Sequence, residues 1–360
     1  MSESFANNQY DIEQGSGSTT PGAVKQASAE NGPRRVEVKA MSRLHMGFFD
    51  LNGNLGRKFG SIGVSLDNPA FVMQVYPSSE FTAEAADTID KQTADSAIKR
   101  AVSVATRIAN ALKLDKGVHI RLDQVIPEHA GLGSGTQLSL AVGSAISRLY
   151  GLESSLEQLA VITQRGARSG IGLGTFARGG VIVDGGRGAM TVIPPLIAGV
   201  EFPEAWRILL IFDHADTGVH GQQESDAFRT LEKLPQAVAA DVCRHVLMQA
   251  LPALAEQDLP VFGAAIRELQ AQTGDYFAPV QGGRYASKRV AAVLAWLGDQ
   301  GVICLGQSSW GPTGFAIFAS VGETEAVQQR LNARFRDEAA LEFVVCKGHN
   351  QGAELQEFYA

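Results

Sequence analysis

The stretch Ile126-Pro-Glu-His-Ala-Gly-Leu-Gly-Ser-Gly-Thr-Gln137 decides how this chain is organised. Gly131, Gly133 and Gly135 alternate with other residues, and apolar side chains follow at steps of three and four residues, which is typical of a helix. A glycine loop that enters a helix presents free backbone N–H groups and the positive end of the helix dipole, so it favours a phosphate group. Glycine spacing alone is a weak signal, and a tight turn that packs a helix on a sheet is the alternative.

The composition is that of an ordinary globular protein. The 360 residues are 45% hydrophobic and 19% charged, and the chain is long enough for one large or two medium domains. Its formal charge of −7 argues against a protein that binds nucleic acid through a basic face. We find no pattern of a signal peptide or membrane span, and the three cysteines have no metal or disulfide spacing. We therefore expect a cytoplasmic protein with a small-molecule ligand, without a membrane or nucleic-acid partner.

Local patterns divide the chain into three parts. Residues 1–33 are rich in small polar residues and are expected to form a mobile tail. Residues 34–195 contain strand-like runs, a helix at 97–112 and the glycine loop. Pro194-Pro195 marks the boundary to residues 196–360, where helices and strands alternate. This order predicts an α+β fold with two domains.

Basic residues lie near glycines in two further places. Arg57-Lys58 follows a hairpin turn signal, and the glycine-rich segment from Arg165 to Gly180 is strongly basic. Guanidinium groups bind phosphate and carboxylate in bidentate fashion, so Arg43, Arg57, Lys58, Arg168 and Arg178 are candidate anion ligands; each is alternatively a solvated surface charge. The candidate phosphate-binding residues are Gly131, Gly133, Ser134, Gly135, Thr136, Gln137, Arg43, Arg57, Lys58 and Arg178.

Three segments in a fixed order carry a family resemblance. They are Ser42-Arg-Leu-His-Met-Gly47, Pro127 with Gly131-Leu-Gly-Ser-Gly135, and a late glycine-containing loop at 305–314. In this order the chain resembles the GHMP superfamily of small-molecule kinases, whose central motif reads Pro-x3-Gly-Leu-Gly-Ser-Ser. The resemblance covers residues 35–350 or so. It implies an N-terminal domain with the glycine loop, a ferredoxin-like C-terminal domain and an active site between them.

Two positions depart from the kinase pattern. Kinases of the superfamily commonly carry Ser-Gly-Val-Asp, with the Asp as base, and the matching run here is Ser169-Gly-Ile-Gly172. The second serine of the central motif, which often helps to hold Mg²⁺, is Gly135. Loss of a general base costs about 10²–10⁴ in rate. A kinase would therefore need a replacement that the sequence does not show.

One branch of the superfamily shares these departures. The strings Gly131 to Gln137, Arg168-Ser-Gly-Ile-Gly172 with Gly179 to Gly186, and Gln307-Ser-Ser-Trp-Gly-Pro312 are similar to the β-ribofuranosylaminobenzene 5′-phosphate synthases of the methanopterin pathway. The resemblance implies a transferase that joins 4-aminobenzoate, or a close 4-substituted benzoate, to 5-phosphoribosyl 1-diphosphate with loss of CO₂ and diphosphate. Because CO₂ leaves the ring in place of a proton, a strong base is dispensable, which fits Gly172.

This resemblance suggests roles for the remaining candidates. Arg168, His45 and Asp184 are expected to be catalytic, with Mg²⁺ as cofactor and unknown protein ligands. The substrate-binding candidates are Gln307, Ser308, Ser309 and Trp310, the last by stacking on the aromatic acid. The alternatives are core packing for Trp310, a structural role for His45 and His129, and turn positions for Asp50 and Asp184.

Other interpretations of the chain stay open at this point. An ATP-dependent GHMP-type kinase and a catalytically inactive, nucleotide-binding sensor are the alternatives to a synthase, and we expect a homodimer. The stretch Ile211 to Gly218, with Asp213 and Asp216, faintly resembles the diphosphate loop of ordinary phosphoribosyltransferases. It lacks the adjacent acidic pair and the Rossmann-like core, so we predict a strand end and a turn.

Overall fold

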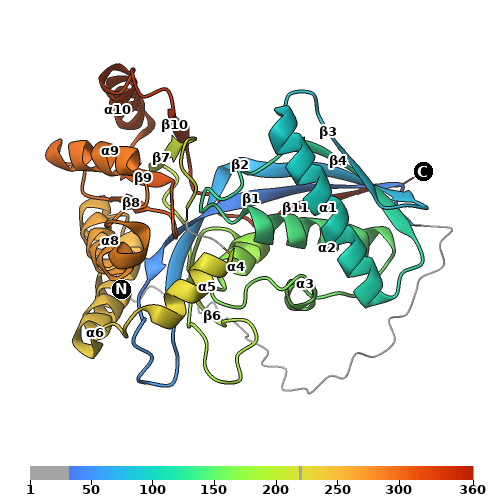
Figure 1. The fold of residues 1–360 in the computed structure, drawn as a ribbon, viewed down its shortest axis with the longest axis horizontal. Coiled ribbons are helices and arrows are strands. Elements are labelled where there is room, and N and C mark those ends of the chain that lie inside the picture. Colours follow the sequence, from blue (N-terminus) through green and yellow to red (C-terminus); the bar gives the residue numbers. More distant parts are fainter. Residues whose placement is uncertain (1–31, 219–220, 360) are drawn as a thin grey trace, which may run out of the picture.

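The structure, a computed structural model, describes residues 32–218 and 221–359, with only the backbone of residues 221–225 (Figure 1). The expected tail over 1–33 therefore lies almost wholly outside the described residues. The described chain forms two sheets, each with its own helices, and the larger one lies to the right in Figure 1.

The larger sheet is built on two long antiparallel strands, β1 (Arg35–Phe48) and β2 (Ser61–Ser78). Its strand order is β11-β1-β2-β4-β3, while β5 pairs with β2 and β6 pairs with β5. Along the first half of β1, buried and partly buried residues alternate, as expected for a strand with one face in the core. The remaining strands are β3 (Thr82–Ala85), β4 (Gly117–Gln124), β5 (Val181–Asp184), β6 (Leu196–Val200) and β11 (Glu354–Phe358).

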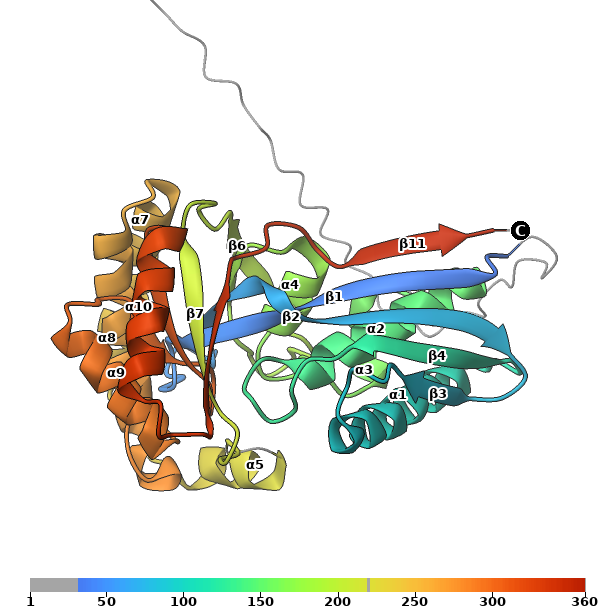
Figure 2. The ribbon, with the colours of Figure 1, turned by 90° about the horizontal axis from the view of Figure 1, so that it is seen from above.

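Helices α1 (Lys91–Leu112) and α2 (Ser134–Leu149) pack on one side of this sheet (Figure 2). The Asp90 side chain caps α1 by accepting a hydrogen bond from the Thr93 N–H at 3.0 Å. Small alanines on the buried face of α1 let it approach the sheet closely. Two shorter helices complete this lobe, α3 (Leu156–Ile162) and α4 (Ile171–Arg178).

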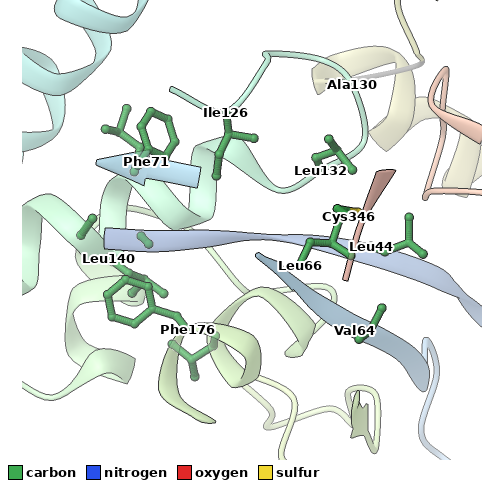
Figure 3. Packing of buried hydrophobic residues seen from close by; sticks show 14 of the residues in the cluster. Leu44, Val64, Leu66, Phe71, Ile126, Ala130, Leu132, Leu140, Phe176 and Cys346 are labelled. Carbon is green, nitrogen blue, oxygen red and sulfur yellow. The ribbon is translucent and has the colours of Figure 1, made fainter. Parts of the chain in front are cut away.

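One hydrophobic core joins the larger sheet to its helices and to the second lobe. Leu44 and Val64 of the sheet belong to the same buried cluster as Leu132 of the glycine loop and Phe176 of α4 (Figure 3). The cluster also contains Cys346 from the second lobe. The glycine loop is therefore fixed to the core by the leucine between its glycines.

The second sheet has the strand order β10-β7-β9-β8, with every neighbouring pair antiparallel. In chain order these strands are the fourth, first, third and second, which is the ferredoxin-like arrangement that the sequence predicted. They are β7 (Arg207–Asp213), β8 (Leu305–Gln307), β9 (Gly314–Phe318) and β10 (Leu341–Cys346). The helices of this lobe are α5 (Gly221–Thr230), α6 (Gln236–His245), the π-helical turn η1 (Val246–Ala250), α7 (Leu251–Ala255), α8 (Leu259–Gln281), α9 (Lys288–Asp299) and α10 (Val321–Arg334).

The sheets divide the chain differently from the expected ranges 34–195 and 196–360. Strand β6 lies beyond that boundary yet pairs with β5 in the first sheet. Strand β11, at the far end of the chain, pairs with β1 over Arg35 to Lys39. The larger sheet therefore takes strands from both expected parts.

Candidate active site

Three segments that are far apart in the sequence meet at the side chain of Ser308. Its hydroxyl donates a hydrogen bond to the Gly131 carbonyl at 2.8 Å and accepts one from the His45 N–H at 3.1 Å. The Ser309 N–H donates to the His45 carbonyl at 3.0 Å, and the Arg43 N–H donates to the Leu132 carbonyl at 3.0 Å. The structure thus brings together the early, central and late segments that the sequence singled out.

The glycine loop has the conformation of a backbone-lined anion site. Gly131 and Gly133 have φ angles of 73° and 79°, which favour glycine. A Cβ on Gly131 would lie 2.4 Å from the Ser308 carbonyl oxygen, so the close approach of the two loops also requires glycine. Helix α2 begins after Gly133 without a side-chain cap, which leaves its first N–H groups for a ligand.

Arginine side chains lie on both sides of this loop. Arg43 donates a hydrogen bond to the Gly131 carbonyl, and a Cβ on Gly133 would lie 3.0 Å from its Cγ. A Cβ on Gly135 would lie 3.0 Å from the guanidinium carbon of Arg165. Arg165 was not among the expected site residues, because nothing in the sequence shows that it lies over Gly135.

The segment from Arg168 to Gly172 packs against the start of α2. The buried Gln137 side chain donates to the Gly172 carbonyl at 2.8 Å, and a Cβ on Gly172 would lie 3.0 Å from the Thr136 methyl carbon. The Arg168 guanidinium lies over the Phe228 ring of α5, 4.5 Å from its centroid. At Gly172, where the sequence motif places the kinase aspartate, a side chain would therefore need a small shift of Thr136.

Asp184 is a buried anchor of this segment. Its carboxylate accepts hydrogen bonds from the hydroxyls of Ser61 and Ser169 and from the N–H groups of Gly170 and Gly186. Burial raises the pKa of Asp184, while these hydrogen bonds act in the opposite direction. Its contacts hold the Arg168–Gly172 turn against β2 and β5, and a catalytic role for Asp184 stays a prediction.

His45 is buried, and its ring lies 4.6 Å from the ring of Phe48. Burial lowers its pKa from 6.5 to about 3, and Arg43 adds to this, so the ring is neutral at physiological pH. Among the described residues neither ring nitrogen has a hydrogen-bond partner. The ring lines a cavity of about 10 Å³, close to the space that one water needs.

The late loop contributes an aromatic cluster. Trp310 is 2% exposed, and its ring lies 4.0 Å from that of Phe277 and 5.4 Å from that of Phe228. The Gln307 side chain accepts from the Ala286 N–H at 2.7 Å and so ties the loop to the region before α9. In this structure Trp310 is packed in the core, and its stacking on a substrate ring stays a prediction.

The other basic candidates lie at separate places in the structure. Arg57 donates at 2.8 Å to the carbonyls of both Gly185 and Gly186, and so ties the β1–β2 connection to the turn after Asp184. Burial lowers the pKa of the neighbouring Lys58, and Lys233 adds to this. Arg178 ends α4, at the opposite end of that helix from Gly172.

Asp50 lies in a turn, as the alternative for it predicted, and His129 also lies in a turn. The Asp50 carboxylate accepts from the N–H groups of Asn52 and Gly53, both at 2.9 Å. The exposed His129 has a φ of 56° and lies 3.8 Å from the Glu128 carboxylate. Among the described residues, no group of three or more His, Cys, Asp or Glu is placed to hold a metal ion.

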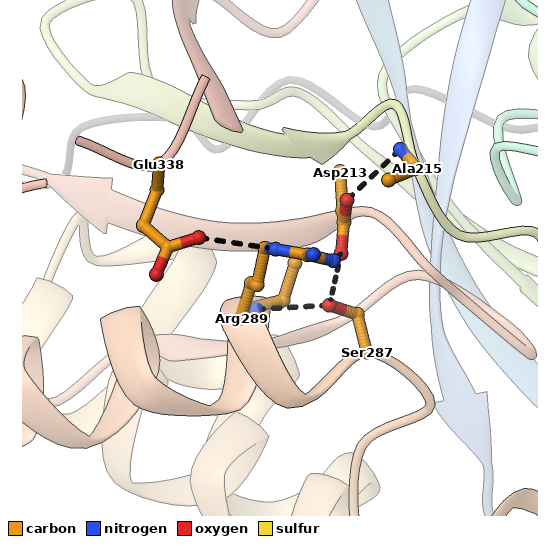
Figure 4. Close-up of polar contacts among 6 residues, drawn as sticks. Asp213, Ala215, Ser287, Arg289 and Glu338 are labelled. Carbon is orange, nitrogen blue, oxygen red and sulfur yellow. Dashed lines mark hydrogen bonds and ion pairs between the residues drawn. The ribbon is translucent and has the colours of Figure 1, made fainter. Parts of the chain in front are cut away.

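The stretch with faint similarity to a phosphoribosyltransferase loop is a strand end and a turn, as predicted. Asp213 ends β7, and its carboxylate accepts hydrogen bonds from the Ala215 N–H, the Ser287 hydroxyl at 2.7 Å and Arg289 at 3.3 Å (Figure 4). Glu338 holds Arg289 from the other side at 3.1 Å. The Asp213 carboxylate therefore holds the start of α9 through Ser287 and Arg289.

A spacious hollow of the described chain lies elsewhere. It measures about 1570 Å³ and is lined by Ser147 and Tyr150 at the far end of α2, about 24 Å from the glycine loop by helix rise. None of the expected site residues lines it.

No helix of the described residues is long and apolar enough to cross a membrane.

The fold and two family matches define the class. The family model described as "GHMP kinases N terminal domain" matches residues 97–180, and the model described as "GHMP kinases C terminal" matches residues 250–337. Homoserine kinase from Cytophaga hutchinsonii has the same fold, with a TM-score of 0.63, 18% identity, and coverage of 90% of this chain and 98% of that one. Mevalonate diphosphate decarboxylase from Enterococcus faecalis is similar, with a TM-score of 0.61, 16% identity, and coverage of 90% and 99%.

Curated relatives narrow this class. The beta-ribofuranosylphenol 5′-phosphate synthase of Methanocaldococcus jannaschii is 32% identical over 341 residues, which are 88% of this chain and 99% of the relative. The synthase of Archaeoglobus fulgidus is 30% identical over 340 residues, with coverage of 89% and 99%. The chain thus belongs to the family of these synthases within the GHMP superfamily. A 4-diphosphocytidyl-2-C-methyl-D-erythritol kinase of Synechococcus is 28% identical over 242 residues, 67% of this chain and 70% of the kinase.

Proposed function

We propose that this protein joins a 4-substituted benzoate to 5-phosphoribosyl 1-diphosphate, with loss of CO₂ and diphosphate. The observation that carries the proposal is its family, since the relatives that align with nearly their whole length are named as synthases of a ribofuranosylphenol phosphate. A phenol in that name corresponds to a 4-hydroxyl on the ring. The proposed acceptors are therefore 4-aminobenzoate, from the sequence resemblance, and 4-hydroxybenzoate, from the relatives.

The geometry around Gly172 supports this reaction over phosphoryl transfer to an alcohol. A side chain at Gly172 would meet Thr136, so the base of the kinases has no counterpart at this place. In the proposed reaction the ring carbon that bears the carboxylate attacks the anomeric carbon, and diphosphate leaves with the electron pair of the broken C–O bond. The bond to the carboxylate then breaks, CO₂ leaves, and its electron pair restores the aromatic ring. No proton has to be removed.

The chain's part in this reaction is to hold anions and orient the acceptor. We propose that the N–H groups at the start of α2 and the flanking Arg43 bind a phosphate group; the helix start without a side-chain cap supports this. We propose that Arg168, held over the Phe228 ring, receives a charged group of the acceptor or the donor. Mg²⁺ would arrive on the diphosphate, because both oxygens of the Asp184 carboxylate already accept hydrogen bonds, and one oxygen of Asp50 accepts two.

A radiochemical assay tests the proposal. Purified protein is incubated with phosphoribosyl diphosphate, Mg²⁺ and carboxyl-labelled 4-aminobenzoate or 4-hydroxybenzoate, without ATP. We expect labelled CO₂ and diphosphate in equal amounts with at least one acceptor. Formation of ADP from ATP and a small alcohol, with no CO₂ from either benzoate, would identify a kinase and refute the synthase.

A matched pair of variants links the activity to the site. Arg168→Gln should lower kcat/KM for phosphoribosyl diphosphate or the benzoate by about tenfold or more, because a charge-assisted contact is lost. Arg148→Gln removes an arginine whose side chain is 63% exposed at the far end of α2, so it controls for the change of net charge. Equal kinetics in the two variants would remove Arg168 from the site.

A further inference from the structure

A small hollow beside the glycine loop is lined by cations that neither the sequence motifs nor the proposed reaction uses. It measures about 220 Å³ and lies between α1, the start of α2 and the residues after α3. The lining residues that bear on anion binding are Lys99, Arg100, Arg107, Gly135, Ser139 and Arg165.

The chain builds this hollow from three elements. Lys99, Ser103 and Arg107 follow one another at steps of four residues on α1, so they share one face of the helix. The Arg165 N–H bonds to the Ala160 carbonyl at 2.7 Å, which fixes the residue at the end of α3. Its guanidinium then lies over Gly135, where any Cβ would come within about 3 Å of three guanidinium atoms.

Positive charge in the hollow exceeds the negative charge around it. Arg100 forms an ion pair with Glu128 at 2.5 Å. Within the described chain, Lys99, Arg107 and Arg165 have no ion-pair partner. Burial lowers the pKa of Arg165, and the charges of Arg100 and Arg107 add to this effect. A bound anion would relieve the repulsion among these groups.

A buried hydroxyl provides an independent sign of a ligand. Ser139 lines the hollow from α2, one turn after Gly135, and is 1% exposed. Its hydroxyl has no hydrogen-bond partner among the residues that the structure describes. Buried polar groups without a partner are uncommon, and one that lines a cationic hollow is suited to a ligand oxygen.

We propose that this hollow is a second anion subsite, which binds a phosphate group through Arg165, Arg107 and the Ser139 hydroxyl. The proposal rests on the proposed function, whose donor carries a phosphate on C5 of ribose and a diphosphate on C1. The subsite takes one of these two ends, and the other lies at the N–H groups of the glycine loop. Gly135 keeps the two regions in contact, because it has no side chain between the loop and Arg165.

Calorimetric titrations test the subsite without turnover. Ribose 5-phosphate and inorganic diphosphate are each titrated into wild type, the double variant Arg107→Gln/Arg165→Gln, and the control Arg148→Gln. We expect the double variant to bind one of the two probes about tenfold or more weakly, while the control binds like wild type. Weaker ribose 5-phosphate binding assigns the hollow to the 5-phosphate, and weaker diphosphate binding assigns it to the diphosphate. Unchanged affinity for both probes in the double variant overturns the subsite.

Gly135→Ala provides a second test that removes no charge. Its methyl group would displace the Arg165 guanidinium, so the same probe should bind several-fold more weakly, although alanine is the better helix residue. A lower affinity with an unchanged or higher midpoint of thermal unfolding supports the subsite, and an unchanged affinity contradicts the role of Arg165.

The two proposals fail separately. If the wild-type protein consumes phosphoribosyl diphosphate and the variants have unchanged probe affinity and KM, the synthase proposal stands and the subsite proposal is overturned. A wild-type protein that releases no CO₂ or diphosphate, yet binds a probe through Arg165 and Arg107, keeps the subsite and overturns the synthase.

Discussion

At the scale of single residues, Gly172 separates this chain from the kinases whose fold it shares. It occupies the place of the kinase aspartate and is packed against Thr136 at the start of α2. The difference from the kinases is therefore more than a missing carboxylate, since any side chain at this position would press on Thr136. An aspartate introduced at position 172 should therefore not give kinase activity.

We predict that Gly172→Asp gives no ADP-forming activity and lowers the free energy of unfolding by about 1–3 kcal/mol, because it brings a charged group into a buried position beside Thr136. The measurements are urea unfolding and a coupled ADP assay with small alcohols. Gly172→Ala is the control that adds the Cβ without the charge. ADP formation by Gly172→Asp would show that Thr136 moves to admit the carboxylate and that a single substitution gives kinase activity.

His45 makes the stability of the protein depend on pH. Its pKa is about 3 in the folded state and 6.5 in the unfolded chain, so the unfolded chain binds the proton first on acidification. The stabilisation is complete above pH 6.5 and falls by about 1.4 kcal/mol per pH unit between 6.5 and 3. Urea unfolding at pH 7.5 and 5.0 should show a loss about 2 kcal/mol larger in wild type than in His45→Gln. Equal losses in both proteins would mean that folding does not lower the pKa of His45, so that the ring is protonated in the folded state at pH 5.0.

The sequence correctly selected site residues that lie within its short motifs. Arg43, Gly131 and Ser308 belong to segments that it selected, and the structure joins them by hydrogen bonds. It did not reveal Arg165, because the contact with Gly135 depends on where α3 ends relative to α2. Lys99 and Arg107 were hidden for a similar reason, since charged residues on the outer face of a helix usually face solvent.

At the scale of elements, the site is a set of loops joined by few contacts. Ser308 connects the loop after β8 to both β1 and the glycine loop. The sequence predicted those segments, and the helix that it predicted over 97–112 is the C-terminal part of α1. It missed α4, since Gly172 and Gly174 lower the helix propensity, and it also missed α5. It missed β3, β6 and β11, which have only four or five residues each, too few for a clear alternation of apolar and polar residues.

Removal of the Ser308 hydroxyl should loosen this connection. Ser308→Ala leaves the buried His45 N–H without its partner, so we expect a loss of about 1–2 kcal/mol in the free energy of unfolding and a higher KM for the donor. Ser309→Ala is the comparison for stability, because Ser309 contacts His45 through its backbone N–H. Equal stability of the two variants in urea would show that Ser308 does not hold the loops.

Strand β11 should be needed for the stability of the first sheet. It pairs with β1 from Arg35 to Lys39, and Leu355 packs on the core. Deletion of residues 353–360 should lower the midpoint of thermal unfolding by about 5 °C or more, because backbone hydrogen bonds and apolar contacts are lost together. Deletion of residues 359–360 alone is the control. An unchanged midpoint in the longer deletion would show that the strand is dispensable.

At the scale of the whole molecule, the two lobes share one core. The main buried cluster contains Leu44 of β1 and Leu140 of α2 together with Ile208 of β7 and Phe262 of α8. A separate cluster in the second lobe includes Leu294 and Phe318. Sequence patterns indicated the two lobes, but they do not report which apolar faces meet across them.

The shared core predicts cooperative unfolding. Circular dichroism and tryptophan fluorescence should report the same midpoint in urea, since Trp206 lies in the shared cluster and Trp296 packs on the second one. Two separated transitions would show that the lobes unfold independently. The variant Phe262→Ala, which shortens a side chain of the shared core, should lower the midpoint that both probes report by the same amount.

The pairing of Arg35 with Phe358 places the first and last described strands side by side. A short peptide linker between these positions would close the backbone into a ring, and the ring could be cut in the exposed turn around Met190. The fold therefore does not dictate which lobe leaves the ribosome first, and a circular permutant should reach the same native state with its lobes synthesised in the opposite order.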